Sequence, residues 1–336
     1  MPLKKLEISQ NVGVKLKVMP EVITINKQRV GLGEHATINF NIARLPTYTS
    51  IDIPVHIYRS NIDGPVLLLT GGLHGDEING VEIIRRMIET KKIIPEKGTV
   101  VAIPIVNIYG FIQNARGLPD GKDINRSFPG LKDGSLAKLI AYTLMKDIIP
   151  HIDCGIDFHT GGASRSNFPQ IRVSFNSSKA QKLAEAFAPP VILDSPLISK
   201  SFRSASHKKG KPIIVYEAGE SLRFDELGIT EGINGTLRLM KYLGMNSSTP
   251  LSAKTDREIR TYLKSTWLRS KNAGLFQPKA KLGDILAKGS LLGYINDPYG
   301  DLHTKVIAPK DGQIIGLNYS PVVHKGDALI HFAYNY

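Results

Sequence analysis

Residues 71–77, Gly-Gly-Leu-His-Gly-Asp-Glu, contain the side chains of this sequence that are best suited to metal chemistry. His74 and Glu77 stand three residues apart, so one turn of chain can direct an imidazole and a carboxylate at the same point. Both groups are suitable ligands for Zn²⁺, and a catalytic zinc ion takes three protein ligands and a water molecule. His159 is a third candidate, in the similar context Asp-Phe-His-Thr-Gly-Gly of residues 157–162. A lone His-x-x-Glu pair is usually a capping histidine beside a surface glutamate, but two histidines before glycine-rich turns favour a metal site.

The segments that would position these residues alternate between strand and helix patterns. Residues 65–70 form a continuous apolar run that ends at Gly71, as expected for a strand buried on both faces. Further strands are expected at 99–106, 154–158 and 213–216, and helices at 80–90, 136–149 and within 226–243. Asn79 is expected to cap the first helix, and Pro150 to stop the second. This alternation predicts an α/β fold with a mostly parallel or mixed sheet sandwiched by helices, in which His74 lies at the carboxyl end of a strand.

The sequence changes character after Gly244. Residues 246–250, Asn-Ser-Ser-Thr-Pro, have the composition of a linker, and β-rich segments with regular glycines follow. Two similar sequence segments, at 281–286 and 324–329, each place a Gly-Asp turn before an apolar pair. We therefore expect a catalytic domain of residues 1–250, with a β-rich N-terminal extension to about residue 45. A small β-barrel or sandwich is expected at residues 251–336.

Four motifs in this order resemble the zinc carboxypeptidase superfamily and, within it, the succinylglutamate desuccinylase/aspartoacylase family. They are His74-x-x-Glu77, an Asn-Arg-x-Phe signature within residues 123–130, the distant His159, and Tyr-Glu-Ala-Gly at 216–219. Together they span about residues 65–219, and the trailing β region, which resembles a biotinyl/lipoyl barrel, is also a family feature. The resemblance implies a zinc hydrolase with a carboxypeptidase-like catalytic fold.

The resemblance also implies which residues hold the metal and move the proton. His74, Glu77 and His159 would bind one Zn²⁺ per chain, and Glu217 would be the general base. Such a site is chemically coherent, because zinc lowers the pKa of bound water towards 7 and polarises an amide oxygen. A carboxylate that is not a ligand is still needed to collect the proton and pass it to the departing amine.

Three further residues match substrate-handling positions of the family. Arg116 would polarise the scissile carbonyl and stabilise the oxyanion, while Asn125 and Arg126 would grip a substrate carboxylate. A guanidinium suits carboxylate recognition better than an ammonium does, although either arginine could instead form a salt bridge that orders its own loop. The sequence leaves open whether Arg172 reaches the site, and whether Glu220 is a rival base.

Composition narrows the classes of protein. The chain has 336 residues, of which 42% are hydrophobic and 22% charged, which is typical of globular proteins. Its single cysteine, Cys154, excludes an internal disulfide, and no signal peptide or apolar run of about 20 residues is visible, so we expect a cytoplasmic protein without membrane contact. The net charge of +13 comes from scattered basic pairs without a stacking motif, which argues against nucleic acid and suits a small anionic substrate.

These observations predict a zinc-dependent amide hydrolase that acts on carbon–nitrogen bonds other than peptide bonds. It would remove an acetyl- or succinyl-type group from an N-acyl amino acid or a related small molecule. The first alternative is a metallocarboxypeptidase acting on small peptides, and the second is a non-catalytic binding or carrier protein. A covalent carrier is disfavoured because the expected hairpin tip, residues 296–301, contains no lysine. The acyl group and the amine stay open, and a homo-oligomer is compatible with the sequence.

Overall fold

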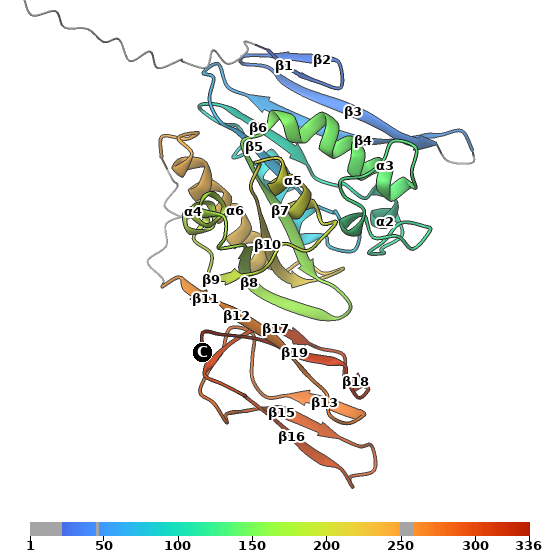
Figure 1. The fold of residues 1–336 in the computed structure, drawn as a ribbon, viewed down its shortest axis with the longest axis vertical. Coiled ribbons are helices and arrows are strands. Elements are labelled where there is room, and N and C mark those ends of the chain that lie inside the picture. Colours follow the sequence, from blue (N-terminus) through green and yellow to red (C-terminus); the bar gives the residue numbers. More distant parts are fainter. Residues whose placement is uncertain (1–21, 45–46, 249–257) are drawn as a thin grey trace, which may run out of the picture.

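The computed structural model describes residues 22–44, 47–248 and 258–336 of the chain. An α/β unit, which extends to residue 248, and a C-terminal β unit follow each other along the long axis of the molecule (Figure 1). The expected domain boundary at residue 250 lies outside the described residues, as do the last two residues of the predicted linker. No helix in the described part of the chain is both long and apolar enough to cross a membrane.

A mixed sheet of 13 strands runs through the α/β unit and continues into the C-terminal unit. Its parallel centre consists, in spatial order, of β6 (Thr99–Ile103), β5 (Val66–Thr70), β7 (Cys154–Gly161) and β10 (Ile213–Glu220). Antiparallel strands extend this centre at both sides: β4 (Ser50–Arg59) and β3 (His35–Arg44) beyond β6, and β8 (Arg165–Val173) beyond β10. The predicted α/β fold with a mostly parallel or mixed sheet is confirmed.

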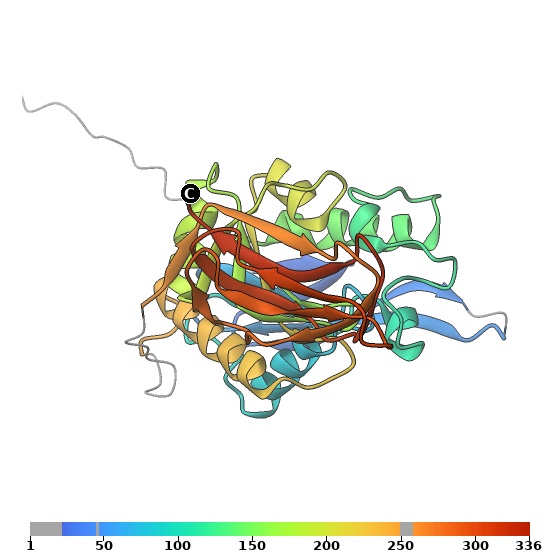
Figure 2. The same ribbon diagram turned by 90° about the horizontal axis from the view of Figure 1, so that it is seen from below.

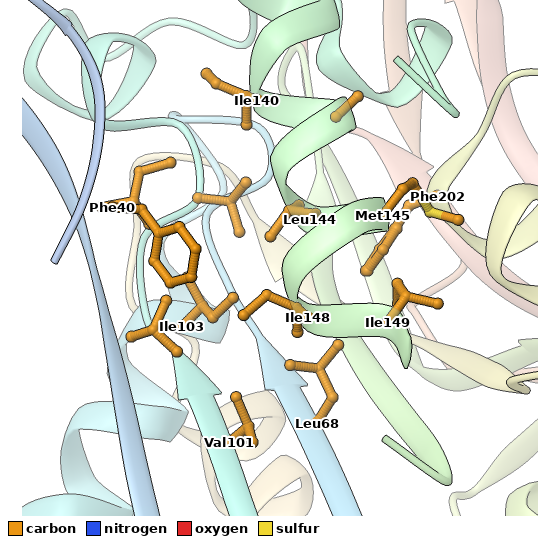
Figure 3. Packing of buried hydrophobic residues seen from close by; sticks show 14 of the residues in the cluster. Phe40, Leu68, Val101, Ile103, Ile140, Leu144, Met145, Ile148, Ile149 and Phe202 are labelled. Atoms are coloured by element: carbon orange, nitrogen blue, oxygen red, sulfur yellow. The ribbon is translucent and has the colours of Figure 1, made fainter. Parts of the chain in front are cut away.

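Helices cover both faces of this sheet, as the end-on view shows (Figure 2). Alternate residues of β5 supply two separate cores: Leu67 and Leu69 enter one, and Leu68 enters the other. The first core is closed by α1 (Asn79–Glu89), α4 (Ser178–Phe187) and α6 (Glu226–Tyr242). The second is closed by α3 (Leu136–Thr143) and α5 (Phe202–Lys208). Figure 3 shows the second core, where Leu144 and Ile148 lie against Leu68, Val101 and Ile103 of the sheet.

One of two expectations about helix ends was wrong. After α3 the helix continues as a π turn (Leu144–Ile148), which ends within one residue of the expected position, and Pro150 lies in the 3-10 turn that follows (Ile149–His151). Proline is tolerated in the first turn of a helix, where its missing N–H would have no partner. Asn79 is the first residue of α1 and does not cap it; its side chain accepts from the Asp225 N–H at 3.0 Å and donates to the Ala218 carbonyl at 3.4 Å.

The C-terminal unit is joined to the α/β unit by direct strand pairing. The strands β12 (Lys264–Arg269), β19 (Ala328–Tyr334) and β17 (Gly312–Asn318) continue the main sheet, and Gly316 of β17 pairs with Asn167 of β8. The second layer is a four-stranded sheet of β16 (His303–Ile307), β15 (Leu291–Asn296), β13 (Gly274–Pro278) and β18 (Val322–Val323). Side chains of both layers form one core, so the C-terminal unit packs as a sandwich.

The remaining elements are short. They are β1 (Val22–Ile25) and β2 (Gln28–Gly31), which form a separate hairpin, α2 (Ile108–Ile112), a 3-10 turn (Ile124–Arg126), β9 (Val191–Asp194), β11 (Arg260–Tyr262) and β14 (Ile285–Leu286). The strand β11 pairs with β9, which makes a second connection between the two units.

The two similar segments of the C-terminal unit, residues 281–286 and 324–329, form the same turn. In one, the Lys281 N–H donates to Asp284 Oδ2 at 2.8 Å, and in the other the His324 N–H donates to Asp327 Oδ2 at 2.8 Å. The glycine before each aspartate has a φ near +90°, which explains why both segments contain glycine there.

Candidate metal centre and active site

The candidate site lies at the carboxyl ends of the parallel strands. His74 and Glu77 follow β5, His159 lies near the end of β7, and Glu217 lies at the neighbouring register position of β10. The sequence placed the two strand ends too early, because β7 continues to Gly161 and β10 to Glu220. The chemistry is nevertheless at the edge of the sheet where open α/β folds bind ligands.

The loop between β5 and α1 requires glycine beside His74. A Cβ atom on Gly75 would lie 1.9 Å from the carbonyl carbon of Gly110 in α2, and Gly72 has a φ of +56°. A larger residue at either position would move the loop or strain its backbone. The glycines therefore let the loop that carries His74 and Glu77 pass close to α2 and to the segment after β6.

Three buried side chains converge on one point. His74 Nδ1 lies 2.7 Å from Glu77 Oε1, and His159 Nδ1 lies 2.8 Å from Glu77 Oε2. Their ligand atoms all lie within 4.8 Å of one another, and each of the three residues is at most 5% exposed. This group could hold a metal ion, and its two imidazole nitrogens and one carboxylate are the donor set of many catalytic zinc sites.

Two further carboxylates fix the orientation of both imidazole rings. Asp123 Oδ1 lies 3.2 Å from His74 Nε2, and Asp157 Oδ2 lies 2.8 Å from His159 Nε2. Metal-binding histidines commonly donate their second ring nitrogen to a carboxylate in this way. Nδ1 is therefore the nitrogen that each ring presents to a metal. Neither aspartate was expected from the sequence to have a role, although Asp157 precedes His159 by two residues and Asp123 begins the segment with the Asn-Arg-x-Phe signature.

The protonation of the group follows from this arrangement. Burial alone would lower the pKa of His159, but Asp157 and Glu77 outweigh burial and raise that pKa well above its usual value. Burial would raise the pKa of Glu77, but the two histidines outweigh it and hold the carboxyl well below its usual value. Glu77 is therefore an anion, and a metal cation that binds to the imidazole nitrogens has to displace protons.

Glu217 is held beside the centre by two polar neighbours. Asn167 Nδ2 donates to Glu217 Oε2 at 2.7 Å, and Arg172 Nη1 lies 3.0 Å from Glu217 Oε1. Arg172, which the sequence left open, is thus brought into the site, and Asn167 was not anticipated. Glu220 is turned towards Arg223, whose Nε lies 3.5 Å from its carboxylate, and it does not line the cavity that Glu217 lines.

The three residues expected to handle substrate occupy different environments. Arg116 donates to Glu77 Oε1 and Asp123 Oδ2, each at 3.1 Å, so it stands directly beside the candidate metal ligands. Arg126 is exposed and donates to the Asn125 carbonyl at 2.7 Å, and it makes no ion pair with any described carboxylate. Asn125 Oδ1 accepts from the Phe202 N–H at 2.9 Å, which ties this loop to α5.

All seven residues singled out from the sequence line one cavity of about 270 Å³: His74, Glu77, Arg116, Asn125, Arg126, His159 and Glu217. Five arginines and three carboxylates line it, so its walls carry an excess of positive charge before any metal ion is counted. The volume is slightly below the usual range for ligand pockets. The cavity therefore suits a small anionic molecule.

Three other residues that line the cavity were not expected from the sequence: Arg165, Arg203 and Trp267. Arg203 donates through Nη2 to the Pro196 carbonyl at 2.7 Å, whereas its buried Nη1 has no hydrogen-bond partner among the described residues. Burial lowers the pKa of Arg203 to about 10, so it stays protonated at neutral pH. Trp267 comes from β12 of the C-terminal unit. No local sequence motif connects these three positions to the metal ligands.

Comparisons with known proteins identify related sequences and structures. The family model of the succinylglutamate desuccinylase/aspartoacylase catalytic domain matches residues 63–243. The N-alpha-acetyl-L-2,4-diaminobutyric acid deacetylase of Halomonas elongata is 27% identical over 296 residues, which cover 83% of this chain and 85% of the relative. The crystal structure of a succinylglutamate desuccinylase/aspartoacylase from Rhodobacter sphaeroides superimposes with a TM-score of 0.79 at 25% identity, covering 90% of this chain and 95% of that one. The product-bound ectoine utilization protein EutE (DoeB) of Ruegeria pomeroyi has the same fold, with a TM-score of 0.78 at 22% identity and the same coverage.

Proposed function

This chain belongs to the succinylglutamate desuccinylase/aspartoacylase family, and from that premise we propose that it is a zinc-dependent amide hydrolase acting on carbon–nitrogen bonds other than peptide bonds. Its substrate is a small anionic N-acyl amino acid or related molecule, from which it removes an acetyl- or succinyl-type group. The observation that carries the proposal is the buried His74–Glu77–His159 group with the non-ligand carboxylate of Glu217 beside it in one cavity.

His74, Glu77 and His159 are the residues that would hold one Zn²⁺ per chain, through two Nδ1 atoms and the Glu77 carboxylate. When bound there, zinc would acidify a water molecule and polarise the scissile carbonyl. Asp123 and Asp157 keep the two rings in the required orientation through their contacts with Nε2. The fit of the donor set supports this assignment, because two imidazoles and a carboxylate leave a fourth position for water.

Glu217 is the proposed general base. Its Oε1 and Oε2 atoms are held by Arg172 and Asn167, so the carboxylate is oriented before substrate arrives. It would take a proton from the attacking water and pass it to the nitrogen of the departing amine.

Arg116, Asn125 and Arg126 are the proposed substrate-handling residues. Arg116 lies next to the metal ligands, where a guanidinium can stabilise negative charge on the carbonyl oxygen of the substrate. Asn125 uses its Oδ1 for Phe202, which leaves its NH₂ group to donate to a carboxylate. Arg126 has no carboxylate partner in the described part of the chain and can supply a second donor pair. Arg203 lies in α5, whose first residue, Phe202, donates to Asn125, and it adds a buried Nη1 donor.

The alternative of a peptide-trimming metallocarboxypeptidase uses the same metal and base but needs more room. Trp267 closes one side of the cavity from the C-terminal unit, and the volume of about 270 Å³ suits a single acylated amino acid. The carrier alternative has less support, since the tip between β15 and β16 is Asn-Asp-Pro-Tyr-Gly-Asp and offers no lysine.

A substrate panel tests the proposal. The zinc-loaded enzyme would be assayed for amine release from N-acetyl amino acids, N-succinyl amino acids and dipeptides with the same C-terminal residues. We expect hydrolysis of one or both acyl series at rates well above those for the dipeptides. Faster hydrolysis of the dipeptides would favour the carboxypeptidase, and no zinc-dependent turnover on any substrate would refute the hydrolase proposal.

A further inference from the structure

Arg165 differs from the other arginines that line the cavity. Arg116 and Arg172 each pair with carboxylates, and Arg126 and Arg203 each donate to backbone carbonyls. The guanidinium of Arg165 makes neither a hydrogen bond nor an ion pair with any residue that the structure describes, and its Nε is buried without a partner. A buried donor without an acceptor is costly, so this position favours an acceptor brought by a ligand.

Trp267 holds Arg165 in place without using its donors. The Arg165 Cζ lies 5.5 Å from the centre of the Trp267 ring, in the range of a cation–π contact. A cation–π contact does not use up the N–H groups of the guanidinium, which can still bind a carboxylate in bidentate fashion. Trp267 and Arg165 both line the cavity.

The Trp267 ring is itself fixed from behind. His331 of β19 stacks on it with a centroid distance of 4.7 Å and an interplanar angle of 9°, and His331 Nε2 lies 2.9 Å from Ser265 Oγ. A Cβ atom on Gly316 would lie 3.4 Å from Trp267 Cη2 and 3.1 Å from Asn167 Oδ1, so the indole, β17 and the residue that holds Glu217 lie close together. Trp267 is therefore a rigid wall of the catalytic cavity on the Glu217 side.

We propose that Arg165 and Trp267 form a specificity subsite for a second carboxylate of the substrate, in addition to the one assigned to Asn125 and Arg126. This inference rests on the proposed function. The second carboxylate could be the far end of a dicarboxylic acyl group or the side chain of an acidic amino acid. The same guanidinium would repel a cationic side chain, so the diaminobutyrate compound named for the Halomonas elongata relative would be a poor substrate here.

Kinetics on matched substrates test the subsite. The zinc-loaded enzyme would be compared on N-acetylalanine, N-acetylglutamate, N-succinylalanine and N-acetyl-2,4-diaminobutyrate. We expect wild type to prefer N-acetylglutamate or N-succinylalanine over N-acetylalanine, and which of the two it prefers locates the second carboxylate. Equal or better kcat/KM on N-acetylalanine or the diaminobutyrate compound would overturn the proposal.

Variants separate the subsite from a merely structural role. Arg165→Gln should lower kcat/KM on the preferred dicarboxylate by about 30-fold or more, mainly through KM, and change N-acetylalanine turnover by no more than about threefold. Arg165→Lys should recover only part of the loss. Arg223→Gln is the matched control, because Arg223 is exposed and lies outside the cavity. An equal loss on all substrates in Arg165→Gln, with Arg165→Lys restoring none of it, would contradict a specificity role.

Fluorescence gives a readout that does not depend on turnover. Trp267 is the single tryptophan of the chain, so its emission reports directly on the subsite. Glutamate and succinate, compared with alanine and acetate, should produce a saturable change that disappears in Arg165→Gln. If no N-acyl compound is hydrolysed but this change is seen, the subsite stands and the proposed function fails. If neither dicarboxylate changes the emission, the subsite is refuted whatever the enzyme hydrolyses.

Discussion

Two groups of residues in the cavity, the candidate metal ligands and the arginines, differ in how completely other protein groups satisfy their polar atoms. Both nitrogens of His74 and His159 and both oxygens of Glu77 have protein partners at 2.7–3.2 Å. Among the arginines that line the same cavity, Arg165 Nε, Arg172 Nε and Arg203 Nη1 are buried without a partner among the described residues. The candidate ligands are organised in advance for one fixed task, whereas the arginines present donors that a substrate can satisfy.

Under the proposed function, this difference would separate catalysis from specificity. Changes at the metal ligands or at Glu217 should affect all substrates alike, because they remove the chemistry itself. Changes at Arg126 or Arg165 should affect substrates according to their carboxylates. The following predictions test this division, from the largest expected effect to the smallest.

Removal of a metal ligand should have the largest effect. His74→Ala and His159→Ala each leave two protein ligands, so both variants should lose bound zinc and all measurable turnover on every substrate. Metal content by mass spectrometry and amine release by assay check this. His303→Ala, in the exposed β16 edge strand, is the control and should keep both. Retention of one zinc ion per chain in either ligand variant would show that the site is elsewhere.

Loss of the base should stop turnover but keep the metal. Glu217→Gln preserves shape and the Asn167 and Arg172 neighbours, while turnover should fall by roughly 10²- to 10⁴-fold, the usual contribution of general acid–base catalysis. Zinc content and thermal unfolding should match wild type. Glu220→Gln is the paired control and should keep its turnover. If Glu220→Gln were inactive and Glu217→Gln active, Glu220 would be the base.

Arg126→Ala should lower kcat/KM by about 10- to 100-fold for substrates that carry the α-carboxylate, the size expected for hydrogen bonds to a charged group. The measurement compares an N-acyl amino acid with its decarboxylated N-acyl amine. Wild type should prefer the acid strongly, and the variant should lose that preference. Equal wild-type rates on the two compounds would mean that no carboxylate is recognised there.

Asp157→Asn tests the orientation of His159. An amide cannot accept from Nε2–H as strongly as a carboxylate, so zinc affinity should fall by about 10- to 100-fold while the ligands stay in place. Competition with a chromogenic chelator measures the affinity. Excess zinc should restore turnover in this variant but not in His159→Ala, and failure of that rescue would indicate a role other than positioning.

The smallest expected effect is a pH dependence of the free energy of unfolding that comes from His331, the residue stacked on Trp267. Burial, with a contribution from Arg172, lowers the pKa of His331 from its ordinary 6.5 to about 3. The unfolded chain therefore binds a proton at this residue between pH 6.5 and 3, whereas the folded chain does not, so the free energy of unfolding should decrease as the pH falls through that window. Urea unfolding at pH 7 and pH 4.5 checks this, with His331→Phe expected to show a smaller decrease. An NMR titration of His331 near pH 6.5 would contradict it.

The same division explains which parts of the site could be predicted from sequence. His74 and Glu77 lie three residues apart, and His159 and Glu217 lie near the ends of apolar strands, so short motifs were enough to identify them. Parallel pairing of β5, β7 and β10 then brings these motifs to one edge of the sheet.

Arg165 and Trp267 could not be found in this way. They are about a hundred residues apart in sequence and meet only because β17 pairs with β8 and β12 pairs with β19. The glycine spacing of the C-terminal region predicted a separate β unit. It contained no local signal that β12, the strand of Trp267, would face the cavity. Asn79 was misassigned for a related reason, since its partners, Ala218 and Asp225, lie about 140 residues away.

The central claim is that one zinc ion at His74, Glu77 and His159 is required for hydrolysis. The most direct measurement is a titration of the metal-free enzyme with Zn²⁺, in which amine release from the preferred N-acyl amino acid is followed at each addition. The account predicts that metal-free protein is inactive and that activity rises linearly to a break at one zinc ion per chain. Full activity of the metal-free protein, or activity that does not respond to any added metal, would contradict it.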